Sequence, residues 1–141
     1  MRNFITILIF SLIAISCITD KTDQLPAITV DMIDPENPPV IEFSELEFVF
    51  DTLAMGSSIS HTFVFKNVGK TPLLIHSVKA ACGCTVLKGW PKHPIFPGES
   101  GEIPIDFTPK RPGSQRKYIS VIANTRPATN RLFIKGEVVG I

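Results

Sequence analysis

Residues 102–108 read Glu-Ile-Pro-Ile-Asp-Phe-Thr, the clearest alternation of polar and apolar side chains in the chain. Successive side chains of a β-strand point to opposite faces, so this pattern predicts a strand that buries Ile103, Ile105 and Phe107. Pro104 has no amide donor, which favours either an edge strand or a position whose amide faces away from a partner strand. The stretch therefore predicts a half-buried strand with one face in a core.

The same period of two runs through the sequence before this strand. Residues 59–65 place His61, Phe63 and Phe65 on one face, so Phe63 and Phe65 are expected in the core and His61 is expected beside it with its polar atoms satisfied. The parity of the apolar positions changes near Ser44-Glu45 and again before Val78. Each change predicts a bulge or a switch of the chain between two sheets.

The sequence after this strand continues the pattern. Alternation in residues 118–123 and 131–138 predicts two longer strands there, and residues 85–87, which precede residues 102–108, are predicted to form a short one. The 12 prolines, nine glycines and ten phenylalanines favour a turn-rich β protein. Short strands at this spacing, without a pattern of helix length, predict an all-β fold: an antiparallel β-sandwich of seven to eight strands over residues 40–141.

Composition and motifs limit the classes of function. A hydrophobic content of 44% with a charged content of 19% describes one globular domain. The net charge of +1 gives no electrostatic reason to expect a nucleic-acid partner. The chain has no Gly-x-Ser-x-Gly, His-Glu-x-x-His or phosphate-loop motif, so the sequence predicts neither catalytic residues nor a bound cofactor.

The first residues have the parts of an export signal. A positive start is followed by an apolar run from Phe4 to Ile15, shorter than the ~20 residues that a membrane-spanning helix needs. Ala14-Ile15-Ser16-Cys17 resembles a bacterial lipobox, although Ile15 stands where a small residue is usual. We expect residues 1–16 to be a lipoprotein signal peptide and Cys17 to be lipidated. The alternative is an ordinary signal peptide with a chance cysteine.

The segment after the signal is rich in Thr, Asp and Pro and keeps no regular period. Residues 17–39 are therefore expected to be the lipidated N-terminus and a disordered, flexible tether. Together with the lipobox, this organisation predicts a membrane-anchored lipoprotein of a Gram-negative-type cell envelope, facing the periplasm or the cell surface.

Two of the three cysteines stand two positions apart, in Ala81-Cys82-Gly83-Cys84-Thr85. Such a pair can close a small disulfide, chelate a soft metal such as Cu(I), or pack as small apolar side chains. A small disulfide can in turn be structural or exchange with partner thiols. Export places the pair in an oxidising compartment and Gly83 permits a tight turn, so the sequence predicts an intramolecular disulfide between Cys82 and Cys84.

The other histidines, the tryptophan and the basic pairs are expected to have structural or solvent-facing roles rather than to form a site. No resident metal is predicted, and a chelate at the cysteines would have to recruit a histidine, for which His93 is the candidate. His76 is expected to face solvent, and Trp90 to cover one end of the sandwich. The basic pairs Lys110-Arg111 and Arg116-Lys117 are expected at a solvated hairpin tip.

Several motifs in this order resemble the DUF1573 family. They are Phe50-Asp51-x-Leu53, His61-Thr62-Phe63-x-Phe65-x-Asn67-x-Gly69, Pro72-Leu73-x-Ile75, Ala81-Cys82-Gly83-Cys84-Thr85, Trp90-Pro91, Pro94-Ile95-x-Pro97-Gly98-Glu99 and Lys135-Gly136-Glu137-Val138. The resemblance covers about residues 41–139. It implies a secreted bacterial domain with an immunoglobulin-like sandwich, similar to ASH/MSP-type domains, and it implies no activity.

The sequence thus predicts a non-enzymatic interaction or structural module of the cell envelope. Its expected partners are the membrane, through the lipid on Cys17, and another envelope protein. That protein is expected to dock at an exposed sheet edge or at the end carrying Cys82, Cys84 and Trp90. The alternative is a thiol-redox or copper-handling protein that uses the Cys82-Gly83-Cys84 pair.

Overall fold

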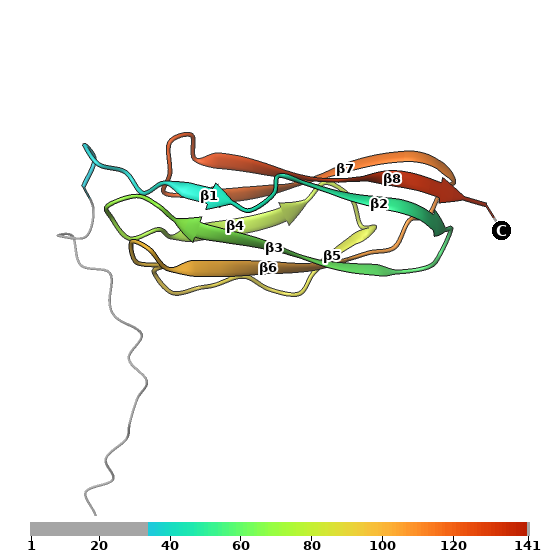
Figure 1. Ribbon diagram of the computed structural model, residues 1–141, viewed down its shortest axis with the longest axis horizontal. Coiled ribbons are helices and arrows are strands. Elements are labelled where there is room, and N and C mark those ends of the chain that lie inside the picture. Colours follow the sequence, from blue (N-terminus) through green and yellow to red (C-terminus); the bar gives the residue numbers. More distant parts are fainter. Residues whose placement is uncertain (1–33, 141) are drawn as a thin grey trace, which may run out of the picture.

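The computed structural model describes residues 34–140, which form two four-stranded sheets packed face to face (Figure 1). The strands are β1 (Ile41–Phe43), β2 (Glu47–Ala54), β3 (Ile59–Asn67), β4 (Ile75–Ala80), β5 (Thr85–Leu87), β6 (Ser100–Phe107), β7 (Gly113–Ala123) and β8 (Thr129–Val139). Their orders are β1-β3-β6-β5 in one sheet and β2-β8-β7-β4 in the other. The predicted sandwich is confirmed. Within residues 34–140, no helix is long and apolar enough to span a membrane.

The core lies between the sheets, on the faces that the alternation predicted. Strands β3 and β6 pair in antiparallel register, with Phe63 opposite Ile103 and His61 opposite Ile105. Side chains at alternate positions therefore meet on the inner face. The five residues predicted to be buried are all at most 1% exposed: Phe63, Phe65, Ile103, Ile105 and Phe107.

The chain changes sheets at the first predicted break in parity. Strand β1 pairs with β3, whereas β2 pairs with β8 in the other sheet. The crossing is fixed by two backbone hydrogen bonds: the Ser44 amide donates to Val64, and the Phe133 amide donates to Leu46. The second predicted irregularity is also present, because the β4–β7 register shifts between Ile75 and Ser77.

Two details of the pairing differ from the prediction. The β2–β8 pair is parallel, so the sandwich is not wholly antiparallel. Strand β6 lies between β3 and β5, so an edge position for Pro104 is wrong. The Pro104 carbonyl accepts from the Lys88 amide, which lies just beyond Leu87 at the end of β5. The Pro104 nitrogen faces the same side of β6 as the Pro104 carbonyl, just beyond the end of β5. Its missing N–H therefore costs no hydrogen bond between strands.

Residues 34–39 pack on the sandwich, although the sequence placed them in the tether. The Asp34 carboxylate accepts from the Glu36 and Asn37 amides and from the Asn37 side chain. These bonds, the one to the Asn37 side chain above all, hold the pKa of Asp34 below its ordinary value. The Thr71 hydroxyl donates to the Asn37 carbonyl at 2.8 Å, and Pro39 is buried. The predicted signal peptide and Cys17 lie outside the described residues.

A buried asparagine organises the loops where this segment meets the sandwich. Asn67, at the end of β3, is fully buried, and its side-chain amide donates to the carbonyls of Thr71 and Ile95. Its side-chain oxygen accepts from the Gly69 amide. The donors and the acceptor of this buried side chain are thereby satisfied. The loop after β3 and the segment before β6 are held together at the end of the sandwich where residues 34–40 enter (Figure 1).

Candidate functional site

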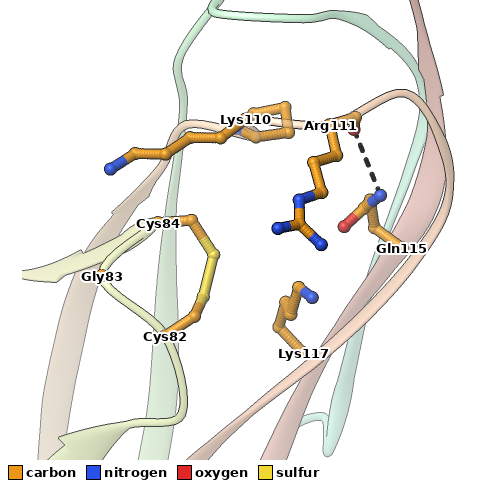
Figure 2. Close-up of a pocket in the computed structure, with 8 residues that line it drawn as sticks. Cys82, Gly83, Cys84, Lys110, Arg111, Gln115 and Lys117 are labelled. Carbon is orange, nitrogen blue, oxygen red and sulfur yellow. Dashed lines mark hydrogen bonds between the residues drawn. A yellow bond between two sulfur atoms is a disulfide. The ribbon is translucent and has the colours of Figure 1, made fainter.

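The turn between β4 and β5 contains a disulfide between Cys82 and Cys84 (Figure 2). The two Cα atoms are 5.2 Å apart, closer than residues two apart in an extended strand. The sulfurs lie on the same side of the turn, as the sequence predicted. The role given to Gly83 is wrong: its φ is not positive, and an added Cβ would meet nothing within 4 Å. The turn closes without needing the conformational freedom of glycine.

Backbone hydrogen bonds hold this turn against both sheets. On one side the Ala81 amide donates to the Tyr118 carbonyl of β7 at 3.0 Å. On the other side the Thr108 amide, directly after β6, donates to the Cys84 carbonyl at 2.8 Å. The disulfide turn therefore bridges the two sheets at the side where their edge strands β4 and β5 lie.

An open pocket of about 250 Å³ lies beside the disulfide (Figure 2). The disulfide turn forms one wall, and the connection from β6 to β7 forms another. Side chains from the first part of β7 complete it. Its lining residues are Cys82, Gly83, Cys84, Pro109, Lys110, Arg111, Gln115 and Lys117. The structure therefore places the cysteine pair beside a basic segment, a proximity that the sequence did not predict.

The parity of β7 explains why two polar side chains face this pocket. Gln115 and Lys117 share the inward parity of Ile119, which is fully buried. Pairing of β4 with β7 ends at Ala80 opposite Ile119, so the earlier part of β7 extends beyond β4. Its inward side chains meet the disulfide turn and the pocket instead of the apolar core. Gln115 donates to the carbonyls of Arg111 and Gly113, which fixes the loop preceding β7.

Three cations line the pocket and no carboxylate does. Figure 2 shows the side chains of Arg111 and Lys117 directed toward the space beside the disulfide, whereas Lys110 extends past Cys84 at the rim. None of the three has a carboxylate within ion-pair distance among residues 34–140. The prediction of a solvated tip is therefore wrong for Lys117, which faces the pocket, while Arg116 lies on the outer face.

Several other cations of the domain do have partners. Lys88 contacts Asp106 at 2.6 Å, and the Ser60 hydroxyl donates to the other oxygen of the same carboxylate. The bond from Lys88, followed by that from Ser60, holds the pKa of Asp106 below its ordinary value. Arg116 and Lys135 both lie within 4.0 Å of the Glu47 carboxylate. Unlike these three, the cations of the pocket have no carboxylate partner among the residues that the structure describes, as is also true of exposed cations such as Lys66 and Lys79; what distinguishes the pocket is that its three cations lie around one space.

The histidines and the tryptophan lie away from the disulfide pocket. His61 stacks on Phe48 with ring centroids 3.8 Å apart and contacts Glu45 at 2.8 Å, as expected for a satisfied histidine at the edge of the core. His76 and His93 are exposed, and neither lines the pocket. Trp90 packs partly buried against the core, with the Lys92 amine 2.9 Å from its ring centroid.

The geometry gives no support to a three-ligand metal site with His93. Within residues 34–140, no three side chains of His, Cys, Asp or Glu are grouped so that they could hold a metal ion. Trp90 and His93 do not line the pocket. The candidate site therefore includes the cysteine pair but not Trp90, which the sequence had placed at the same end. The signal that sequence reasoning missed was the inward parity of Gln115 and Lys117.

Comparison with known proteins identifies the family. The model described as "Protein of unknown function (DUF1573)" matches residues 41–138. The chain belongs to the DUF1573 family. This match confirms the family resemblance carried by the Cys82-Gly83-Cys84-Thr85 and Pro97-Gly98-Glu99 motifs. No curated protein matches the sequence.

Solved structures similar to this DUF1573 domain support the immunoglobulin-like fold. A protein of unknown function from Porphyromonas gingivalis W83 is 24% identical, with a TM-score of 0.61, over 81% of this chain and 51% of that one. The ASH/PapD-like domain 7 of human CEP192 is 14% identical, with a TM-score of 0.58, over 82% of this chain and 95% of that domain. The secreted serine protease VesC from Vibrio cholerae is 8% identical, with a TM-score of 0.60, over 70% and 23%. At these identities the likeness shows the fold alone.

Proposed function

We propose that this DUF1573 domain is a non-enzymatic interaction module of the bacterial cell envelope, anchored to a membrane by lipid on Cys17. It docks another envelope protein at the end that carries the disulfide. One observation carries the proposal: the β4–β5 turn, the β6–β7 connection and the inward face of β7 build an open pocket at that end. Loops at the ends of a sandwich are common binding sites because a rigid scaffold positions them.

Site-specific photo-crosslinking in the native envelope tests the docking surface. A photoreactive amino acid is placed at Pro112, an exposed position beside the pocket, and separately at Val68, which is 46% exposed in the loop after β3. A third version carries it at Val49, 61% exposed on edge strand β2. We expect one abundant adduct from residue 112 and little from the other two. Equal labelling from all three, or adducts from residue 49 alone, would contradict docking at the disulfide end.

The lipid anchor makes a separate prediction about location. Replacing Cys17 by Ser is expected to release the protein from membranes or leave its signal unprocessed, because acyl chains on Cys17 would no longer be added. Mass spectrometry of the mature N-terminus after membrane extraction gives the deciding measurement. An unmodified Cys17, or an N-terminus that still begins at Met1, would refute the anchor while leaving the docking surface open to its own test.

The second candidate function is thiol–disulfide exchange at Cys82 and Cys84. The observation that favours it is the position of the disulfide at a pocket wall beside three cations. A thiolate of a partner dithiol would attack one sulfur, the Cys82–Cys84 bond would break, and the other cysteine would leave as a thiolate that the cations favour. The second partner thiol would then displace the first sulfur, so the partner is oxidised to a disulfide and the pair is reduced to two thiols.

Reduction of the folded protein separates a structural bridge from an exchanging one. Because the bridge closes almost no loop, Cys82→Ser/Cys84→Ser is expected to lower the free energy of unfolding by only ~0–2 kcal/mol. In an interaction module the disulfide has only a structural role, as a wall of the pocket. We therefore expect it to survive millimolar glutathione in the folded state. Ready reduction, together with mixed disulfides to partner proteins, would instead support the exchange function. Trapping of free thiols by alkylation and mass spectrometry measures both.

A further inference from the structure

Three cations gather at the disulfide pocket. Arg111 and Lys117 approach the pocket from different segments, the β6–β7 connection and β7, while Lys110 lies at the rim. Like charges that converge repel one another, and this repulsion lowers stability unless an opposite charge lies between them. The described part of the chain provides no carboxylate within ion-pair distance of any of the three. A negatively charged ligand group in the pocket would relieve this repulsion.

The shape and walls of the pocket restrict what that ligand is. A volume of about 250 Å³ accommodates one acidic side chain or a chain end rather than a folded element. The disulfide and the buried Pro109 supply the less polar walls. Arginine carries a planar fork of donors that matches a carboxylate with two parallel hydrogen bonds. Arg111 is directed into the space beside the disulfide, where such a pair would form (Figure 2).

We propose that this pocket binds a carboxylate from an acidic segment of the partner protein, with Arg111 and Lys117 as the principal contacts and Lys110 at the rim. This rests on the proposed docking function and names the chemistry of its partner. Gln115 has a positioning role, since its amide bonds to the Arg111 and Gly113 carbonyls hold the loop from which Arg111 projects. Charge complementarity of this kind fixes the register of a partner and speeds its encounter.

The test uses the oxidised, ¹⁵N-labelled full chain carrying Cys17→Ser, titrated with a hexaglutamate peptide, a hexaglutamine peptide and inorganic phosphate. With hexaglutamate we expect amide shifts confined to residues 82–84 and 109–117, and weaker shifts as salt rises. Hexaglutamine is expected to cause none. Shifts spread over exposed lysines elsewhere would overturn the site. Shifts of the same amides by phosphate, without any by hexaglutamate, would overturn the carboxylate assignment.

Charge variants make the test specific. Arg111→Gln/Lys117→Gln is expected to weaken hexaglutamate binding by about tenfold or more, because two charge-assisted contacts are lost. Arg111→Lys keeps the charge but loses the fork, so we expect an intermediate loss. The matched control is Lys66→Gln, at an exposed lysine of β3 that pairs with Ser100, the first residue of β6. An equal loss in Lys66→Gln would refute the pocket.

The outcomes separate this inference from the function on which it rests. Photo-crosslinks from residue 112 that persist in Arg111→Gln/Lys117→Gln would leave the docking surface standing and refute carboxylate recognition. If crosslinks from residue 112 never form, the docking function fails, whether or not hexaglutamate binds. Lys66, Arg111, Pro112 and Lys117 are outside the core, and the thermal unfolding midpoint of each variant verifies that it is folded.

Discussion

Replacing Phe107 by alanine is expected to lower the free energy of unfolding by about 3–5 kcal/mol. Phe107 is fully buried at the end of β6, and its ring centroid lies 5.5 Å from that of Phe50 in the opposite sheet. The ring therefore joins the two sheets, and its removal leaves a cavity that the surrounding strands cannot fill without moving. The loss is a large part of the ~5–15 kcal/mol that stabilises a domain. Urea titration of the wild type and Phe107→Ala measures it.

Glu102→Ala is the matched control on the same strand. Glu102 points to the outer face of β6, opposite Val64 of β3, and is exposed. Since its side chain buries little area, we expect a change within ~0.5 kcal/mol. Equal effects of the two substitutions would show that the inner and outer faces of β6 have been assigned incorrectly.

Replacing Gly136 by alanine is expected to cost about 3 kcal/mol. The register of β2 against β8 passes from Val49 opposite Lys135 to Thr52 opposite Glu137. Gly136 therefore faces the irregular stretch of Phe50 and Asp51. A Cβ at this position would lie far inside van der Waals contact with the Phe50 carbonyl oxygen and ring. Since the backbone oxygen cannot rotate away as a side chain would, the strands must separate locally. Thermal and urea unfolding measure the cost.

Gly83→Ala provides the control for this glycine effect. Gly83 has no positive φ, and an added Cβ would meet nothing within 4 Å. The substitution removes conformational freedom from the unfolded chain without strain in the folded one, so it is expected to be neutral or to stabilise by ~0.4–1 kcal/mol. If Gly83→Ala destabilised as much as Gly136→Ala, the close approach of β2 to β8 would not be the cause.

The strands and the core could be predicted because they depend on local alternation. The period of two identified Phe63 and Phe107 as core residues, and the change of parity near Ser44 located the sheet switch. The parallel pairing of β2 with β8 depends instead on which distant strands meet, and no local pattern specifies that. The packing of residues 34–39 was missed for a similar reason: its contacts are with Gly69 and Thr71, in a loop far along the chain.

The candidate site was predictable only in part. The cysteine pair is visible in the sequence because its members are two residues apart, and the structure joins them as expected. The cations were assigned to a solvated tip because Arg116 and Lys117 were considered as a pair. In a strand, neighbouring residues point to opposite faces. Extending the inward parity of Ile119 back to Lys117 would have placed one charge inside, but the proximity of the disulfide turn depends on the tertiary fold.

Residues 34–40 and the disulfide pocket lie toward opposite ends of the sandwich (Figure 1), so the pocket is not at the end where the N-terminal segment joins the domain. Asn67 and Thr71 hold the entering chain at the end where β6 begins, whereas Pro109 and Arg111 follow the end of β6. Strand β7, with 11 residues, spans about 35 Å between the two ends. With lipid on Cys17, the chain would reach the domain at the end where residues 34–40 enter, and the cationic pocket would lie toward the other end. Whenever this end of the domain points away from the membrane, the pocket meets proteins rather than anionic lipid headgroups, whose field falls off within a Debye length.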